Sequence, residues 1–308
     1  MKLLIELPSW IGDSIMSTPA IENLISCYND VKITIIGSSE AIAVIKNHPK
    51  VVNTFVLDKT YKELYFVLKN LGNFDVFFSF RSSLRTKIMK AFISADAKFQ
   101  FNKNIYSKGH QVQRYNNFVI TSLEIKSQPG PLILYPCKRP INGLNKIVGI
   151  NPGASYGSAK RWYPEKFATV AGALSKNYDI IIFGGENEKD IANEIEKNLI
   201  KMGVKNYQNL AAKTSISELI SIISTLDLFI TGDSGPMHIA ATFKVSTVAI
   251  FGPTKSEETS QWSNQKCIVV KKDLECQPCM KRSCPLNHHN CMKKIDPSEV
   301  LEAIETLN

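Results

Sequence analysis

The sequence predicts an α/β protein made of two domains, each with a parallel β-sheet and helices packed around it. Its 308 residues are about twice the usual length of one domain, which is roughly 150 residues. Short apolar runs alternate with helix-length segments in both halves of the chain, a pattern typical of parallel sheets. A stretch rich in proline and glycine separates the two alternating series. These observations predict two α/β domains joined by a linker.

The first half contains the predicted strands and helices of the first domain. Strands are expected at Lys2–Leu7, Lys32–Ile36, Val51–Leu57 and Phe74–Phe78. Helices are expected at Ser14–Cys27, Glu40–Lys46, Tyr61–Leu71 and Leu84–Phe92. The linker is expected at residues 129–145, where prolines and glycines interrupt every periodic pattern.

The second half repeats this alternation. Strands are expected at Ile147–Asn151, Tyr178–Phe183, Leu226–Thr231 and Thr247–Phe251, and helices at Pro164–Ser175, Glu188–Lys201 and Ser215–Ser224. Pro164 suits the first turn of a helix, and Ser215 with Glu218 forms a capping box. The domains are therefore expected to span residues 1–140 and 141–295. A C-terminal helix, 296–308, is expected to pack back toward the first domain.

The composition limits the classes of partner. The net charge is +9, which favours anionic partners, but the basic residues are scattered and form no nucleic-acid motif. No run approaches the roughly 20 apolar residues that cross a bilayer, and Met1–Leu7 is too short for a signal peptide. We therefore expect a cytoplasmic protein whose cysteines stay mostly reduced. A nucleotide, a phosphorylated lipid or a membrane surface fits the charge at least as well as DNA or RNA.

Residues 231–240, TGDSGPMHIA, are predicted to form a strand end, a tight turn and a helix start. Glycines bracket the turn and permit close approach of a ligand to the backbone. The first N–H groups of a helix lack intrahelical partners and carry partial positive charge, which suits an anionic oxygen. The alternative is an ordinary connection in which Asp233 or Ser234 is the N-cap. The turn alone leaves both readings open.

The loop after the first strand, residues 8–14, occupies the position where a dinucleotide-binding fold shows G-x-G-x-x-G. It has one glycine, Gly12, and carries Trp10 where a pyrophosphate needs bare backbone, so a Rossmann dehydrogenase is disfavoured. Asp13 is then a candidate general base for an attacking hydroxyl. The alternative is that Asp13 only caps a helix that starts near Ser14.

The second domain opens with a comparable loop, residues 151–162, rich in small residues and ending in cations. Such a loop can wrap a phosphate with backbone N–H groups, while Lys160 adds a point charge and Arg161 a planar fork. Trp162 is expected to pack in the core rather than stack on a base.

Two further loops follow strands of the second domain. Glu186, in the loop GGENE, can accept hydrogen bonds from ribose hydroxyls, or is simply an exposed loop glutamate. Thr254 follows the strand that ends at Phe251. Because ligands of open α/β sheets bind at the carboxyl ends of the strands, all of these loops should line one cleft.

Read in order, the motifs LPSWIGDSIMSTPAI, NPGASYGSAKRW, TGDSGPMHIAAT and AIFGPT make this chain resemble the ADP-heptose:lipopolysaccharide heptosyltransferases of glycosyltransferase family 9. Within that family it resembles the heptosyltransferase II type. The resemblance runs from Leu3 to the last helix. It implies a GT-B fold and an inverting transfer of class EC 2.4 with no cofactor required for catalysis. It also implies an N-terminal domain that binds the acceptor and a C-terminal domain that binds ADP-heptose.

The resemblance also implies roles for individual residues. Asp13 matches the proposed base of the family, and Lys160 matches the lysine that pairs with the donor phosphates. Donor binding is assigned to Ser155, Lys160, Glu186, Asp233, Ser234, Gly235 and His238. Acceptor binding is assigned to Ser9, Trp10, Gly12 and Arg81. For His238, which lies one helical turn after Ser234, a core histidine satisfied by the backbone stays an alternative.

The implied acceptor is the phosphorylated lipid A-core of a Gram-negative cell, and the implied site of action is the cytoplasmic face of the inner membrane, with peripheral contact and no nucleic acid. Addition to Kdo, as in the heptosyltransferase I type, stays open. So do a related transferase with another nucleotide sugar or a protein acceptor, and a non-catalytic nucleotide- or phospholipid-binding module. The pairing of Asp13 with Lys160 disfavours the last, because mere binding needs no base.

A cysteine-rich segment lies outside this pattern of motifs. Cys276, Cys279, Cys284 and Cys291 share it with His288 and His289. The first pair has the spacing of metal ligands, but a second C-x2-C is missing. Two readings stay open, a structural zinc or iron site and reduced cysteines in a basic loop. The nearby cations, Lys281, Arg282, Lys293 and Lys294, are candidates to meet acidic core sugars or lipid headgroups.

Overall fold

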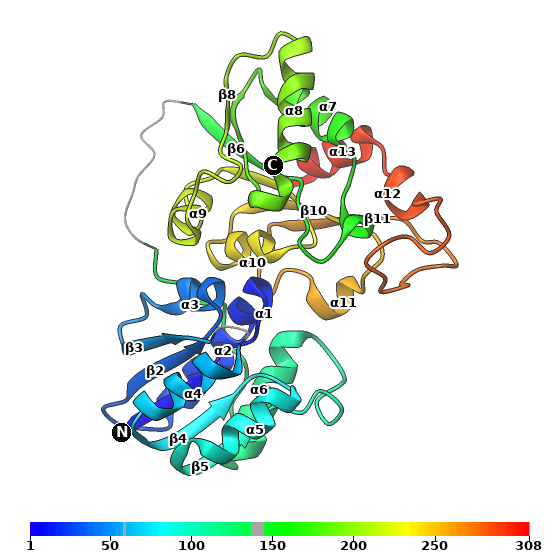
Figure 1. Cartoon of the computed structure of the whole chain (residues 1–308). Coiled ribbons are helices and arrows are strands. Elements are labelled where there is room, and N and C mark those ends of the chain that lie inside the picture. The colour runs from blue at the N-terminus through cyan, green and yellow to red at the C-terminus, as the bar shows by residue number, and fades with distance from the viewer. Residues whose placement is uncertain (58–59, 137–144, 308) are drawn as a thin grey trace. The chain divides into compact units, whose positions relative to one another are not determined.

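The structure is a computed structural model that describes residues 1–57, 60–136 and 145–307. The chain divides into two compact units, Met1–Pro136 and Cys137–Asn308 (Figure 1). Both are α/β units with one parallel sheet each, so the predicted fold class is confirmed. The predicted domain boundary at residue 140 lies outside the described residues.

The first unit is built on a five-stranded parallel sheet with the order β3-β2-β1-β4-β5. Its strands are β1 (Lys2–Glu6), β2 (Lys32–Gly37), β3 (Val51–Val56), β4 (Asn73–Ser79) and β5 (Ser94–Gln100). Its helices are α1 (Ile11–Met16), α2 (Thr18–Ser26), α3 (Ser39–Ile45), α4 (Tyr61–Asn70), α5 (Leu84–Phe92) and α6 (Gln111–Leu123).

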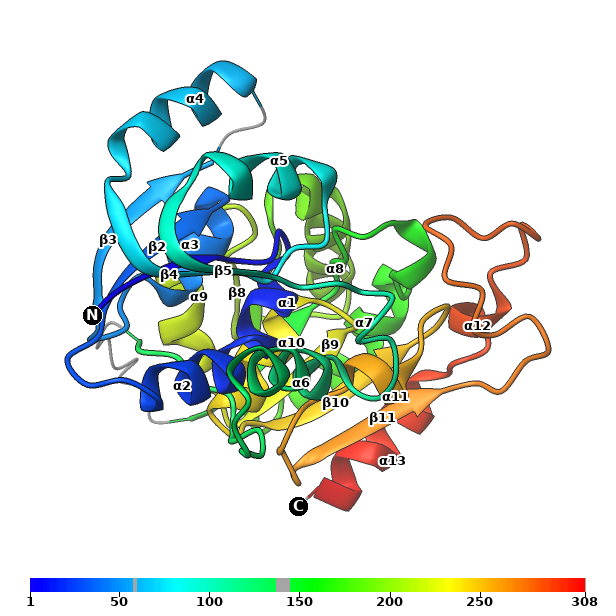
Figure 2. The same ribbon diagram turned by 90° about the horizontal axis from the view of Figure 1, so that it is seen from below.

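The helices of the first unit cover both faces of its sheet (Figure 2). On one face, Leu64 of α4 and Met89 of α5 share a buried cluster with Leu4 and Phe77 of the sheet. On the other side, α6 packs against α1 and α2. Burial of these apolar faces is the main stabilising term of such a domain.

Most of the predicted elements of the first unit are confirmed within one or two residues at each end. The predicted helix Ser14–Cys27 is an exception, because the structure divides it into α1 and α2 at Ser17 and starts α1 at Ile11. β5 and α6 were not predicted. The sequence of β5, SADAKFQ, has no clear apolar face and gives no strong periodic signal.

The second unit is built on a six-stranded parallel sheet with the order β11-β10-β9-β6-β7-β8. Its strands are β6 (Lys146–Asn151), β7 (Tyr178–Ile182), β8 (Tyr207–Asn209), β9 (Leu228–Gly232), β10 (Ser246–Phe251) and β11 (Cys267–Lys271). Its longer helices are α7 (Pro164–Leu174), α8 (Lys189–Lys201), α9 (Ile216–Ile223), α10 (Gly235–Thr242) and α13 (Pro297–Leu307). The short ones are η1 (Ser158–Lys160), η2 (Glu186–Glu188), α11 (Ser256–Thr259) and α12 (Asn290–Lys293).

Local signals read from the sequence explain several of these elements. Ser215 and Glu218 form the expected capping box before α9, with the Glu218 backbone N–H donating to Ser215 Oγ at 3.2 Å. Pro164 opens α7 as expected. Trp162 is fully buried against Phe167, and its indole N–H donates to the Ile295 carbonyl at 3.1 Å, which confirms its place in the core.

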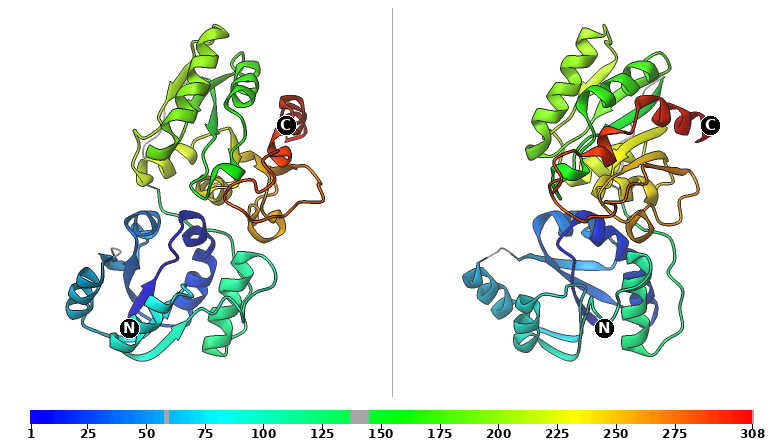
Figure 3. Two further views of the ribbon diagram at one scale, coloured as in Figure 1. Left: turned by 45° about the vertical axis from the view of Figure 1, so that its right-hand side comes forward. Right: turned by 90° about the vertical axis from the view of Figure 1, so that its right-hand side faces the viewer.

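The C-terminal helix packs within the second unit. α13 packs against α7, β10 and β11 (Figure 3), and its buried residues Val300, Ala303 and Ile304 belong to the core of the second unit. The apolar face that was expected to pack back toward the first domain is therefore used within the second unit. No helix in the described parts of the chain is both long and apolar enough to span a bilayer.

Both sheets share one topological property. In each sheet, the first strand of the unit lies in the middle, and the strand order reverses beside it, between β1 and β4 in one unit and between β6 and β9 in the other. The connections on the two sides of such a point leave in opposite directions and open a crevice at the carboxyl edge. The loops after these four strands are therefore the places to look for a site.

Candidate functional site

The donor residues expected in the second unit follow four strands at one sheet edge. The loop 151–163 follows β6, the loop 183–188 follows β7, the turn 232–235 follows β9, and the loop 252–255 follows β10. Since all these strands are parallel neighbours, their carboxyl ends lie along the same edge. The loops after β6 and β9 flank the point where the strand order reverses.

A hydrogen-bonded group of side chains joins the two strands at that point. The Asn151 side-chain amide donates to Thr231 Oγ1 at 3.1 Å and to Ser234 Oγ at 3.0 Å. Asn151 and Thr231 are buried, at the ends of β6 and β9. The amide thereby holds the start of the β9 turn against the neighbouring loop. Asn151 was not singled out from the sequence, because an asparagine at a strand end has no signal of its own.

The turn after β9 leads into α10, and Ser234 occupies the N-cap position. Its side chain accepts no hydrogen bond from the helix backbone, and its hydroxyl lies among Asn151, Thr231 and the Gly232 carbonyl instead. The expected alternative is thus confirmed in the position of Ser234 at the N-cap, but the side chain of Ser234 makes no capping hydrogen bond. The first backbone N–H groups of α10 keep no side-chain cap, which leaves the positive end of the helix dipole for an anion.

Lys160 and Asp233 form a buried ion pair beside this turn. Lys160 Nζ lies 2.5 Å from Asp233 Oδ2, and their side chains are 12% and 6% exposed. Thr254 Oγ1 donates to the same carboxylate oxygen at 2.6 Å. Three loops, those of Lys160, Asp233 and Thr254, thus meet at one carboxylate. The pairing itself was not predicted.

The cysteine-rich segment supports the loop that carries Lys160. The Tyr156 hydroxyl donates to the Met280 carbonyl at 2.8 Å, and the Ala159 backbone N–H donates to the Arg282 carbonyl at 3.0 Å. At Gly157 a Cβ atom would lie 2.3 Å from that same carbonyl oxygen, so only glycine permits this approach.

The Tyr156 ring lies under two cations. Lys160 Nζ is 4.7 Å from the ring centroid and the Arg282 guanidinium 5.5 Å, within the range of cation–π contacts. His289 Nε2 lies 3.0 Å from the Ala159 carbonyl oxygen. The position of Lys160 therefore depends on residues more than a hundred positions later in the chain.

Glu188 is a buried carboxylate that was not predicted from the sequence as a site residue. Its Oε2 accepts from the Gly185 backbone N–H at 2.6 Å, and its Oε1 accepts from the Ser155 hydroxyl at 3.4 Å. A Cβ atom at Gly153 would lie 2.5 Å from Glu188 Cδ, which accounts for a glycine there. Glu188 therefore ties the loop after β7 to the loop after β6.

The other two predicted donor residues have clear surroundings. Glu186 is exposed and lies 2.5 Å from Lys189 Nζ in a surface ion pair, so its side chain can reach solvent or a ligand. His238 is buried on α10, where its carbonyl accepts from the Thr242 hydroxyl at 3.0 Å. His238 lies one turn after Ser234, as expected.

The predicted acceptor residues of the first unit lie at the carboxyl edge of its sheet. Ser9 and Trp10 are exposed in the loop after β1, and Arg81 lies two residues after the end of β4. Asp13 lies in the first turn of α1, whose N-cap position is Trp10. The alternative in which Asp13 is the helix cap is therefore wrong. β1 and β4 flank the point where the strand order reverses, so Asp13 and Arg81 share one edge.

Two buried groups near Asp13 and Arg81, Tyr115 and Glu6, have raised pKa values. Burial raises the pKa of the Tyr115 hydroxyl well above its usual range, and the Asp13 carboxylate adds to that rise. Burial also raises the pKa of the Glu6 carboxyl, although Ser79 and Thr86 donate to it at 2.6 and 3.1 Å. The Arg81 guanidinium lies 3.5 Å from Glu6 Oε1, so a buried carboxylate at the end of β1 orients Arg81.

The four cysteines of the cysteine-rich segment have different environments. Burial raises the pKa of Cys291 to about 11, and Cys279, Cys284 and Cys276 each add to the rise. The backbone N–H of His289 donates to Cys284 Sγ at 3.4 Å and lowers the pKa of that thiol. Within residues 1–57, 60–136 and 145–307, no three His, Cys, Asp or Glu side chains are arranged to hold a metal ion together.

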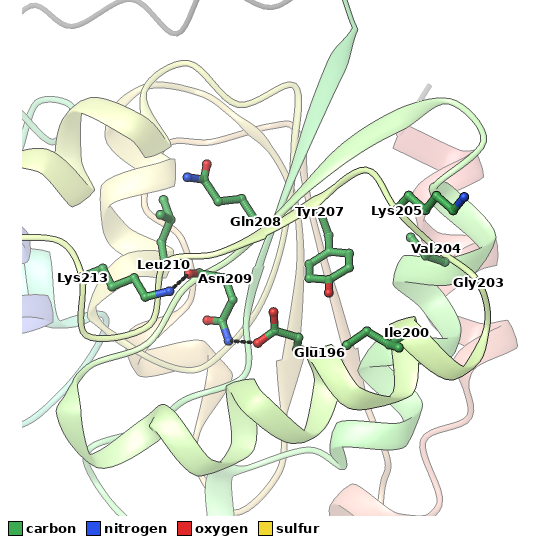
Figure 4. A pocket seen from close by; sticks show the side chains of 10 residues that line it. All are labelled: Glu196, Ile200, Gly203, Val204, Lys205, Tyr207, Gln208, Asn209, Leu210 and Lys213. Atoms are coloured by element: carbon green, nitrogen blue, oxygen red, sulfur yellow. Dashed lines mark hydrogen bonds between the residues drawn. The ribbon is translucent and has the colours of Figure 1, made fainter.

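A surface hollow of about 630 Å³ lies elsewhere in the second unit (Figure 4). It is formed by the end of α8 and the segment around β8, with Glu196, Tyr207, Asn209 and Lys213 among its lining residues. Within this lining, Glu196 accepts a hydrogen bond from the Asn209 side-chain amide at 2.8 Å. The hollow is lined by none of the predicted donor residues. The candidate donor site is therefore the group of loops at the carboxyl edge of the second sheet.

This chain is similar to known glycosyltransferases. The family described as "Glycosyltransferase family 9 (heptosyltransferase)" matches residues 98–290. The lipooligosaccharide heptosyltransferase 2 of Campylobacter jejuni serotype O:2 is 42% identical over all of this chain and 98% of that protein. The structure of Escherichia coli ADP-heptose LPS heptosyltransferase II covers all of this chain and 98% of its own, at 21% identity and a TM-score of 0.81. A glycosyl transferase of family 9 from Veillonella parvula covers 99% and 96%, at 21% identity and a TM-score of 0.82.

Proposed function

Because this chain belongs to glycosyltransferase family 9, the heptosyltransferase family, we propose that it transfers L-glycero-D-manno-heptose from ADP-heptose to the inner core of lipooligosaccharide or lipopolysaccharide. Two relatives that it matches over its full length, at 42% and 40% identity, are named as lipooligosaccharide heptosyltransferase 2. We therefore propose the heptose of the inner core as the acceptor sugar. The product is a core extended by one heptose.

The observation that carries the proposal is the buried pair of Lys160 and Asp233 beside the uncapped start of α10. A nucleoside diphosphate needs a cation and backbone N–H donors within one pocket. The turn around Ser234 and Gly235 supplies the donors, and Lys160 supplies the cation. Both lie where the strand order reverses, the usual place for a nucleotide in this type of sheet.

The proposed reaction is a single displacement. An acceptor hydroxyl oxygen attacks C1 of the donor heptose while the bond between C1 and the β-phosphate oxygen breaks, so the anomeric configuration inverts. Asp13 accepts the proton of the hydroxyl as general base. The electron pair leaves on ADP, whose charge is stabilised by Lys160 and the N–H groups at the start of α10. The proposal assigns no metal to this step.

The remaining predicted residues have proposed supporting roles. Asp233 binds hydroxyl groups of the donor heptose, Glu186 binds the ribose, and Arg81 binds an anionic group of the acceptor core. Ser155 and His238 complete the donor side, while Ser9, Trp10 and Gly12 complete the acceptor side. The protein is proposed to act in the cytoplasm at the surface of the inner membrane, where its acceptor is anchored.

The experiment that tests this proposal separates the base from donor binding. Asp13→Asn should lower transfer by about 10²-fold or more, since a positioned base contributes about 10²–10⁴. The affinity for ADP-heptose, measured by calorimetry, should stay within about twofold, because the donor residues belong to the other unit. Asp96→Asn, an exposed carboxylate on β5, is the matched control and should transfer as the wild type does. Wild-type turnover of Asp13→Asn would refute the base assignment.

A substrate panel tests the sugars themselves. Mass spectrometry of the core lipid after incubation with ADP-heptose, UDP-sugars or GDP-sugars should show a gain of one heptose from the ADP donor alone. A core that ends in heptose should accept, and a core that ends in Kdo should not. Transfer only from a uridine donor would refute the donor assignment, and transfer only to Kdo would replace the heptosyltransferase II type with the type I.

A further inference from the structure

The outer face of α5 is apolar and exposed. Leu84, Ile88 and Phe92 are 74%, 43% and 72% exposed, and their spacing of four residues places them in one stripe along the helix. The opposite face carries Thr86 and Met89, which are buried against the sheet. The helix therefore has two apolar faces, and its stripe of Leu84, Ile88 and Phe92 has no partner among the described residues.

The neighbouring helix, α4, extends this surface. Tyr65 and Phe66 are each 68% exposed. α4 and α5 cover the same face of the first sheet (Figure 2), since their inner residues share one buried cluster. The Arg85 guanidinium lies 3.5 Å from the Thr60 carbonyl oxygen, just before α4, so the starts of the two helices are close together. Scattered exposed apolar residues are ordinary, but a group on two adjacent helices marks an interaction site.

Basic residues border the apolar stripe. Arg85 lies on one side of it and Lys87 on the other, Lys90 lies further round the helix toward its buried face, and α5 contains no acidic residue. The segment from residue 81 to residue 114 contains Asp96 as its single acidic residue. Its basic residues are Arg81, Arg85, Lys87, Lys90, Lys98, Lys103, Lys108 and Arg114. A surface with an apolar centre and a basic border is complementary to an anionic interface whose interior is apolar.

We propose that the outer faces of α4 and α5 form a docking surface for an anionic lipid bilayer. This inference rests on the proposed function, because a lipid-anchored acceptor requires the enzyme to work at a membrane. Helices with an apolar stripe and lysine or arginine at its border lie in the interface between water and acyl chains. Tyr65 and Phe66 are suited to the headgroup level. The basic border is attracted to the negative surface potential of anionic lipids. A protein partner would need acidic side chains around an apolar centre, and the test below includes that outcome.

Vesicle binding tests the proposal with the full chain. Sedimentation with vesicles of phosphatidylcholine and phosphatidylglycerol should pull down the wild type, and vesicles of phosphatidylcholine alone should bind it at least about tenfold less. The triple variant Leu84→Ser, Ile88→Ser, Phe92→Ser should bind the anionic vesicles at least about tenfold more weakly. Lys87→Glu with Lys90→Glu should weaken binding similarly at low salt and less at high salt, since screening already weakens the wild type there.

A matched control lies on the second unit, where Ile200 and Met202 are 58% and 52% exposed. Ile200→Ser with Met202→Ser should bind vesicles as the wild type does. Since the substituted side chains are exposed, except that of Lys90, which is half-buried, each variant should keep the wild-type circular dichroism and melting temperature. Vesicle binding by the triple variant equal to that of the wild type would overturn the proposal. So would equal loss in the control, because the stripe would then not be the lipid contact.

Two further measurements separate this inference from the proposed function. Transfer to a deacylated, water-soluble core should be unchanged in the triple variant, while transfer to the lipid-anchored core in vesicles should fall. A wild type that binds anionic vesicles but transfers no heptose to either acceptor would refute the proposed function and leave the surface standing. A wild type that transfers heptose but changes its oligomeric state through the stripe, with no affinity for vesicles, would replace the bilayer with a protein partner.

Discussion

Replacing Lys160 by methionine separates the structural role of this residue from its role in the reaction. The substitution removes the cation of a buried pair and leaves the Asp233 carboxylate, 6% exposed, with the Thr254 hydroxyl donating to it at 2.6 Å. Removal of one partner of a buried ion pair typically costs about 3–5 kcal/mol, because the other charge stays buried. Since Thr254 still donates to Asp233, we expect the lower end, about 3 kcal/mol.

The expected loss can be measured by thermal unfolding. In a domain of this size, about 1 kcal/mol shifts the melting temperature by roughly 2–4 °C, so Lys160→Met should lower it by about 6–12 °C. The matched control is Lys189→Met, which breaks an exposed pair with Glu186, where the side chains are 48% and 72% exposed. Such surface pairs contribute about 0–1 kcal/mol, so the control should shift the melting temperature little.

A second substitution then tests the cause. Adding Asp233→Asn to Lys160→Met removes the lone buried charge, while the amide oxygen can still accept from Thr254. The double variant should recover most of the lost stability and come within about 1 kcal/mol of the wild type. Transfer of heptose should not recover, because the cation proposed to face the diphosphate is still missing.

Two results would refute this reasoning. A single variant that melts at the wild-type temperature would mean that the pair is not coupled to folding as its burial implies. A double variant that regains transfer would mean that Lys160 serves only to neutralise Asp233. The diphosphate would then need another cation.

Three more predictions follow from the geometry. Gly157→Ala should weaken ADP binding measured by calorimetry and cost about 1–3 kcal/mol, because its Cβ atom would lie 2.3 Å from the Arg282 carbonyl oxygen; unchanged affinity would show that this contact does not position the donor loop. Burial raises the pKa of Glu6 above its usual value of 4.5, so the folded chain holds a proton that the unfolded chain releases, and stability falls as the pH rises through that raised pKa. The melting temperature of Glu6→Gln relative to the wild type should therefore rise from about pH 5 to about pH 8, and a flat difference would contradict this sign. In alkylation with iodoacetamide, Cys284, whose pKa is lowered, should react before Cys267, whose pKa burial raises to about 12; a Cys284 that reacts only after a chelator is added would instead indicate a metal ligand.

The central strands of both sheets could be predicted because their signals are local. β1 and β6 are buried along nearly their whole length, so they read as continuous apolar runs. Two of the elements that were missed, β8 and α6, lack such a signal, whereas β11 was missed although its sequence, CIVVK, is an apolar run. β8 has only three residues, and α6 begins with His110 and Gln113 acting as a capping box, a pair outside the usual N-cap residues.

The donor site could be predicted as a set of loops but not as a set of contacts. Lys160 and Asp233 were both expected at the edge of the second sheet, because each follows a strand end. Their pairing with each other, and the role of Asn151 in joining the ends of β6 and β9, depend on residues about 80 positions apart. A single sequence contains no information on such distances, since strand order rather than strand position decides them.

The contacts of the cysteine-rich segment could not be predicted from the sequence either. From the sequence, the spacing of its cysteines suggested a metal site apart from the donor motifs. In the structure, its backbone contacts the loop of Lys160 through the Met280 and Arg282 carbonyls and through His289. A change in the cysteine-rich segment would therefore move the loop that carries Lys160, and with it the cation. Substitutions in this segment should therefore affect donor binding more than the stability of the fold. The segment is thus part of the site, even though none of its cysteines reaches the donor pocket in the proposed reaction.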